Sequence, residues 1–101
     1  MKLRIDTGDI VATKVTLYKG NMVVGEVVKE REKRSQVVLE AILEMLVSQK
    51  MQIVDIDELE VHLGPGSYTG LRVGVSVANT LQFLLGIPLN GDLRPVMPIY
   101  E

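Results

Sequence analysis

Cysteine is absent from this chain, and other residue types that carry chemistry are scarce. Without cysteine the 101 residues hold no disulfide, no thiol nucleophile and no thiolate metal site. A single histidine leaves metal binding to carboxylates. The 11 basic and 13 acidic side chains give a net charge of −2, so no excess of positive charge attracts a nucleic-acid backbone. We therefore expect no unaided binding of nucleic acid.

Long hydrophobic runs are also missing. No apolar run reaches the roughly 18 residues that a membrane helix needs. The first residues are predicted to enter a strand instead of forming an export signal. We therefore expect no membrane association and a cytoplasmic location. The length predicts one domain of two packed layers, too small to enclose a cleft of its own, which favours an accessory role or a shared site.

The apolar residues that are present follow the periods of an α/β domain. Alternation predicts strands at residues 3–6, 10–18, 22–28 and 59–63, and helical spacing predicts helices at 35–50 and 70–85. The turn signal at residues 19–21 makes the first three strands consecutive and antiparallel. Gly86 and Pro88 are expected to end the second helix. His62 falls on the polar face of the fourth strand and is expected to be a surface residue.

Both predicted helices are apolar around most of their circumference. In a two-layer domain the sheet covers one side of each helix, so we predict an outward apolar face that binds a partner. Gly70, Gly74 and Ala78 are spaced four apart and predict a shallow groove for close helix approach. The residues predicted to bind the partner are Val38, Ile42 and Met45 in the first helix, and Gly70, Leu71, Gly74, Val77, Ala78 and Leu81 in the second.

Glycine and proline crowd residues 64–74, the junction between the fourth strand and the second helix. Backbone N–H groups at such a helix start attract anions. A P-loop is excluded because Leu71 follows Gly70 where that motif needs lysine. The dinucleotide fingerprint is excluded because its glycine spacing is not met. The junction is thus either an anion-binding turn or a tight turn without a ligand.

The same residues carry a resemblance to a known family. Residues 64–74, G-P-G-S-Y-T-G-L-R-V-G, fill every position of the pattern G-P-G-S-[FY]-T-G-[LV]-R-[IV]-G of the TsaB (YeaZ-like) tRNA threonylcarbamoyladenosine biosynthesis family. Ile5-Asp6-Thr7 resembles the start of that family, and residues 86–89 resemble the strand that follows its second helix. The resemblance covers about residues 1–90 and departs at Gly8, where the family usually has serine.

The resemblance implies an ASKHA-type (actin-like, RNase H-like) subdomain with a mixed sheet, antiparallel in its first three strands. It also implies a non-catalytic scaffold that binds and activates a TsaD-type catalytic subunit through its two helices. That machinery includes an ATPase subunit, and the scaffold itself is expected to bind neither tRNA nor a metal. ATP or ADP is expected only at a shared subunit interface. Typical members have two subdomains, so residues 1–101 correspond to the N-terminal one, with the second lobe absent.

Other functions compete with this interpretation. The chain alone forms a homodimer through the same helices if their apolar faces are self-complementary. Alternatively, such a half-domain binds a nucleotide or phosphate at the glycine turn. The residues expected near that ligand are Asp6, Thr7, Gly64, Gly66, Ser67 and Thr69. Asp6-Thr7-Gly8 also matches aspartic proteases, but those proteins are nearly all β, whereas two helices dominate here.

Overall fold

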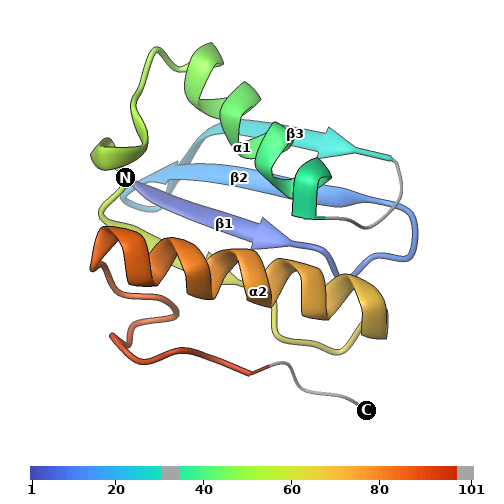
Figure 1. Ribbon diagram of the computed structural model, residues 1–101. Coiled ribbons are helices and arrows are strands. Elements are labelled where there is room, and N and C mark those ends of the chain that lie inside the picture. The colour runs from blue at the N-terminus through green and yellow to red at the C-terminus, as the bar shows by residue number, and fades with distance from the viewer. Residues whose placement is uncertain (31–34, 98–101) are drawn as a thin grey trace.

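The computed structural model describes residues 1–30 and 35–97, which form a four-stranded sheet with two helices packed on one face (Figure 1). The elements are β1 (Lys2–Asp6), β2 (Thr13–Lys19), β3 (Met22–Lys29), α1 (Ser35–Ser48), the 3-10 turn η1 (Ile53–Asp55), β4 (Glu58–Val61) and α2 (Tyr68–Leu85). The strand order is β3-β2-β1-β4, with β1 antiparallel to β2 and parallel to β4. The predicted mixed sheet and both main helices are confirmed. Within the described residues, no helix is long and apolar enough to cross a membrane.

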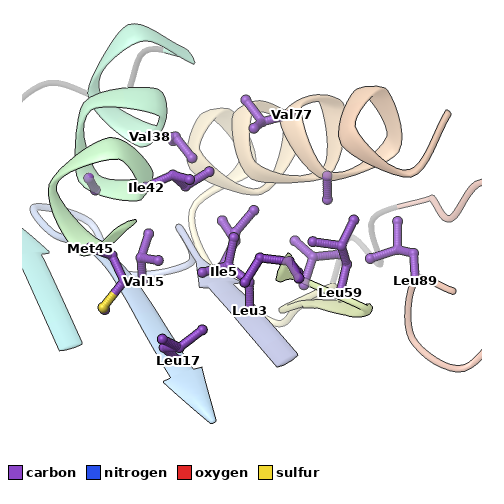
Figure 2. Packing of buried hydrophobic residues seen from close by; sticks show 14 of the residues in the cluster. Leu3, Ile5, Val15, Leu17, Val38, Ile42, Met45, Leu59, Val77 and Leu89 are labelled. Atoms are coloured by element: carbon purple, nitrogen blue, oxygen red, sulfur yellow. The ribbon is translucent and has the colours of Figure 1, made fainter. Parts of the chain in front are cut away.

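Alternate residues of the central strands build the core. Leu3 and Ile5 of β1 and Leu17 of β2 are fully buried beneath the helices. Figure 2 shows these side chains on the same side as Val38 and Ile42 of α1, which are also buried. Burying one such side chain stabilises the fold by about 1.5–3 kcal/mol, so the two-residue period of the strands is the main determinant of this layer.

The opposite face of the sheet carries charged residues in ion pairs. Glu60 of β4 accepts hydrogen bonds from Lys2, at 3.1 Å, and from Arg4, both on β1. Thr16 lies on this charged face and yet is only 4% exposed. It pairs with Arg4 on one side and Glu26 on the other, whose long side chains cover it. The long charged side chains therefore partly cover this face of the sheet.

The second strand begins later than predicted. Residues 10–12 lie outside the strand, because the carboxylate of Asp9 accepts hydrogen bonds from the backbone N–H groups of Val11, at 2.8 Å, and Ala12, at 3.1 Å. Such a local hydrogen bond competes with strand pairing. β2 therefore starts at Thr13, and Ile10 and Val11 are exposed.

The second helix begins earlier than predicted, at Tyr68 instead of Gly70. The Ser67 hydroxyl accepts a hydrogen bond from the Gly70 N–H at 3.3 Å and caps the helix start. The helix ends at Gly86, as predicted, where the backbone is left-handed with φ +66°.

The fourth strand is shorter than predicted and ends at Val61. Asn90 replaces a strand neighbour there, because its carboxamide accepts a hydrogen bond from the Val61 N–H at 2.8 Å and donates one to the Val61 carbonyl at 3.1 Å. Leu89 beside it pairs in parallel with Leu59, and Figure 2 shows their side chains next to each other in the core. The segment after α2 thus lies along the open edge of β4.

Candidate functional site

The end of β1 and the start of α2 meet around Thr7. Thr7 is fully buried, and its hydroxyl donates a hydrogen bond to the Gly70 carbonyl. A Cβ on Gly70 would lie 2.1 Å from the Thr7 carbonyl oxygen, and a Cβ on Gly74 would lie 2.3 Å from Thr7 Oγ1. Only glycine allows so close an approach. The predicted outward groove at Gly70, Gly74 and Ala78 is therefore wrong, because Thr7 fills the space at the two glycines and Ala78 is fully buried.

Most residues predicted to bind a partner are core residues of the chain itself. The buried ones are Val38, Ile42, Met45, Gly70, Leu71, Gly74, Val77 and Ala78. They face the sheet or the neighbouring helix, since those positions share the side of each helix that the core needs. Leu81 alone in that set is partly exposed. Any outward contact must therefore be made chiefly by other residues.

An outward apolar face does exist, but most of its exposed members differ from the predicted set, which contributes only Val77 and Leu81. Leu39, Leu43 and Val47 of α1 are exposed, as are Phe83 and Leu84 of α2. A hollow of about 320 Å³ lies between the two helices, and the residues lining it include Leu39, Val77, Leu81 and Leu84. The four-residue spacing of Leu39, Leu43 and Val47 was readable in the sequence. The sequence did not indicate which side of α1 faces outward, because residues on both sides of the helix are apolar.

The glycine turn is packed against the end of β1. The Ser67 N–H donates to the Gly8 carbonyl at 2.9 Å, and a Cβ on Gly66 would lie 2.7 Å from the same oxygen. The Gly70 N–H is used by the helix cap. Of the residues predicted near a phosphate, Thr7 is buried and Gly64 has φ +134°. Thr69 is exposed on the first turn of α2. The turn thus fixes the start of α2 through contacts within the chain.

The half-buried side chain of His62 packs beside this junction, next to Gly8 and Pro65. Its Nε2 atom lies 2.8 Å from the Pro65 carbonyl oxygen. A Cβ on Gly8 would lie 2.6 Å from His62 Cδ2, so the ring fills the space that a serine side chain would need. The departure from the family pattern at Gly8 therefore has a physical reason.

A polar hollow of about 550 Å³ opens beside His62 and is lined by Asp6, Asp9, Lys14 and Glu26 among others. Partial burial opposes ionisation of Asp6, but hydrogen bonds from the Gly8 N–H and from Arg4 outweigh it and hold the pKa of Asp6 below its ordinary value. Across residues 1–30 and 35–97, no group of three or more His, Cys, Asp or Glu side chains is placed to hold a metal ion. The hollow is richer in carboxylates than in cations, which disfavours a bare phosphate.

Three antiparallel strands, a parallel fourth strand and two helices on one face define an ASKHA-like fold. The structure of YeaZ from Pseudomonas aeruginosa matches it with a TM-score of 0.77, at 24% identity, over 87% of this chain and 41% of that chain. A second structure, of an uncharacterized protein from Pseudomonas aeruginosa with similarity to peptidase YEAZ, also has a TM-score of 0.77, at 21% identity, over 99% of this chain and 43% of that chain. These likenesses show the fold.

The chain belongs to the family described as "TsaD: tRNA N6-adenosine threonylcarbamoyltransferase", whose model matches residues 22–91. It is 34% identical to the tRNA threonylcarbamoyladenosine biosynthesis protein TsaB of Bacillus subtilis (strain 168), over 87% of this chain and 38% of that protein. It is 32% identical to the tRNA N6-adenosine threonylcarbamoyltransferase of Geotalea uraniireducens (strain Rf4), over 87% of this chain and 25% of that protein. The chain therefore spans well under half the length of these relatives. The predicted TsaB (YeaZ-like) resemblance is confirmed.

Proposed function

We propose that this chain is a non-catalytic scaffold in tRNA threonylcarbamoyladenosine biosynthesis, and that it binds and activates a TsaD-type catalytic subunit through the outward faces of α1 and α2. The observation that carries the proposal is the apolar hollow between the helices, with exposed Leu39, Leu43 and Leu84 on or beside it. A contiguous apolar surface of this kind is typical of a protein interface. The family model named for TsaD and the TsaB relatives support a partner of that class.

The contact proposed is between helices. Leu84 is 70% exposed, and burying such a side chain under a partner removes apolar surface from water, worth about 25 cal/mol per Å². The hollow of about 320 Å³ can accept apolar side chains from a facing helix. Ser35, Ser76 and Thr80 also line the hollow, and their hydroxyl groups can hydrogen-bond to water in the unbound chain.

The test is a binding measurement with the TsaD-type subunit from the same source, by light scattering after size exclusion and by calorimetry. Leu84→Glu is expected to weaken binding at least tenfold, because it places a charge in the apolar contact. Val54→Glu is the matched control, since Val54 is 71% exposed on η1, away from the hollow. If both variants and the unaltered chain bound the TsaD-type subunit with equal affinity, the proposed docking face would be ruled out.

Activation is tested separately. Threonylcarbamoyl transfer to tRNA by the TsaD-type subunit, with the other components present, is expected to rise when this chain is added and to fall back with Leu84→Glu. Asp6→Asn is expected to leave that activity intact if the chain does no chemistry itself. A loss of transfer with Asp6→Asn, while binding is retained, would contradict the non-catalytic role.

Nucleotide binding is the second candidate, and the polar hollow of about 550 Å³ beside Asp6 favours it. Its carboxylates require a cation alongside any phosphate, so Mg²⁺ with ATP or ADP is the ligand to try, including at an interface shared with the TsaD-type subunit. Titration calorimetry of the chain with and without that subunit decides the point. Heat of binding only in the mixture would assign the nucleotide to the shared interface.

A further inference from the structure

A tight turn follows the second helix at residues 89–92. The Leu89 N–H donates a hydrogen bond to the Asp92 carbonyl at 2.8 Å, and the Asp92 N–H donates one to the Leu89 carbonyl at 3.1 Å. The two residues between them, Asn90 and Gly91, have φ values of +52° and +79°. Positive φ at both central positions defines a type I′ turn, in which Asn-Gly is a favoured pair. The sequence thus accounts for the turn.

This turn keeps the edge of β4 closed. The Leu59 N–H donates to the Pro88 carbonyl at 2.8 Å, and the Asn90 N–H donates to the Leu59 carbonyl at 2.9 Å. Beside them, the Asn90 carboxamide accepts a hydrogen bond from the Val61 N–H and donates one to the Val61 carbonyl. A carboxylate in its place would have no donor for that carbonyl. The side-chain nitrogen of Asn90 is therefore essential to this contact.

The same carboxamide is followed by a backbone nitrogen that can attack it. In an Asn-Gly pair the glycine nitrogen can close a five-membered ring on the preceding side chain, and glycine has no Cβ to hinder the approach. Asn90 and Gly91 are both exposed, and no described residue accepts a hydrogen bond from the Gly91 N–H. Neither of the other two asparagines, Asn21 and Asn79, is followed by glycine. Spontaneous deamidation is thus favoured at Asn90.

We propose that Asn90-Gly91 is a self-modification site, and that its deamidation releases residues 88–92 from the edge of β4. In the first step a bond forms between the Gly91 nitrogen and Asn90 Cγ, and the bond between Cγ and Nδ2 breaks. The Gly91 amide proton is lost, and the side-chain nitrogen leaves as ammonia. In the second step one water molecule opens the succinimide ring and leaves aspartate or isoaspartate at position 90. Water is the only co-reactant, and no group is oxidised or reduced.

The contact with Val61 couples this chemistry to the closed edge. The two hydrogen bonds hold the Asn90 carboxamide, and the ring closes only after they open, so the reaction follows local opening of the turn. After conversion, a carboxylate oxygen stands where Nδ2 donated to the Val61 carbonyl, and that carbonyl loses its partner. Isoaspartate also lengthens the main chain of the two-residue turn. Because ammonia is lost, the edge stays weakened once it has reacted.

The first experiment locates the modification. The full chain and an end-capped peptide of residues 88–92 are incubated at mildly alkaline pH, and mass spectrometry of proteolytic fragments follows the gain of about one dalton. In the full chain, Asn90 is expected to convert before Asn21 and Asn79. It is also expected to convert at least tenfold more slowly than in the peptide, where nothing holds the carboxamide. Conversion at Asn90 no faster than at Asn21, or equally fast in chain and peptide, would overturn the proposal.

The second experiment measures the release of the edge in the full chain with Asn90→Asp, which carries the carboxylate from the start. Hydrogen exchange of the Leu59 N–H is expected to accelerate at least tenfold at neutral pH, because its hydrogen bond to Pro88 opens more often. Asn21→Asp makes the same change in the exposed turn between β2 and β3 and is the matched control. It is expected to leave the exchange within twofold. Circular dichroism establishes that both variants are folded.

Acid gives a readout that general destabilisation would not. Below about pH 4 the new carboxyl group is protonated and regains a donor, so the difference in Leu59 exchange between Asn90→Asp and the unaltered chain is expected to shrink. The aged chain, separated by ion exchange on its added negative charge, is a second sample that does not depend on refolding a variant. Unchanged Leu59 exchange in both samples would overturn the proposal. Neither experiment uses the TsaD-type subunit, so the result is independent of the docking face.

Discussion

Thr7 illustrates how one short side chain determines where a helix lies. Its hydroxyl reaches the Gly70 carbonyl, and its methyl and hydroxyl groups occupy the space above Gly74. The spacing in the sequence predicted that Gly70 and Gly74 together allow a neighbouring group to come close, and the contacts of Thr7 confirm this. It did not indicate whether the pair faced a ligand, a partner or the chain itself, because glycine at spacing four fits any close neighbour.

Gly70→Ala is expected to destabilise the fold by about 1–3 kcal/mol or more. The added methyl would lie 2.1 Å from the Thr7 carbonyl oxygen, and a backbone atom cannot move aside cheaply. Urea unfolding followed by circular dichroism measures the change. Ser76→Ala on the exposed side of α2 is the control and is expected to stay within about 0.5 kcal/mol. A Gly70→Ala protein as stable as the control would contradict the packing at Thr7.

Gly8→Ser is expected to displace His62, since the new Cβ would lie 2.6 Å from His62 Cδ2. The displaced ring loses its contact with the Pro65 carbonyl, at a cost of about 1 kcal/mol. His62→Ala should make the serine nearly neutral, so a double-mutant cycle measured by urea unfolding is expected to show a coupling of about 1 kcal/mol. Additive effects would mean that the ring and residue 8 are independent.

Among the elements, periodicity predicted every strand and both main helices but placed several of their ends wrongly. The periods of β1, β2 and α1 come from burial, which acts along the whole element. The ends come from local hydrogen bonds made by individual side chains, those of Asp9, Ser67 and Asn90, and such contacts have no period. The 3-10 turn η1 was missed for the same reason, because Asp55 closes it on the N–H of Gln52.

The fold is expected to become less stable in acid, because the ion pairs between β1 and β4 depend on the charge of Glu60. Partial burial opposes ionisation of Glu60, but hydrogen bonds from Lys2 and Arg4 dominate and hold its pKa below the ordinary value of 4.5. The pKa of Asp6 is lowered likewise. A depressed folded-state pKa stabilises the fold above the unfolded-state value, and that contribution is lost as the pH falls through the folded-state value.

Glu60→Gln is therefore expected to lower stability by about 0.5–1 kcal/mol near pH 6, a modest size because the pair is partly solvated. It should also flatten the decline in the urea midpoint below about pH 4.5. Glu58→Gln, an exposed neighbour on β4, is the control and should leave the decline unchanged. A decline as steep in Glu60→Gln as in the unaltered chain would assign acid sensitivity to other groups.

At the scale of the whole molecule, the unpartnered helix face predicts self-association when the chain is alone. Leu43 is 61% exposed beside Leu39 and Val47, and two copies can cover these faces mutually. Analytical ultracentrifugation is expected to show a concentration-dependent dimer that Leu43→Glu shifts to monomer, and that Val11→Glu, at 63% exposure, does not. A dimer insensitive to Leu43→Glu would place the contact elsewhere.

The ion pairs on the face of the sheet away from the helices restrict which surface of the molecule can pack against an apolar partner. Covering Lys2, Arg4 and Glu60 with an apolar layer would remove water from three charges at once, at a cost of several kcal/mol for each ion that is not fully compensated. The helix side carries no comparable penalty at Leu43 or Leu84. A partner with an apolar surface should therefore bind on the helix side and leave Lys2, Arg4 and Glu60 in solvent.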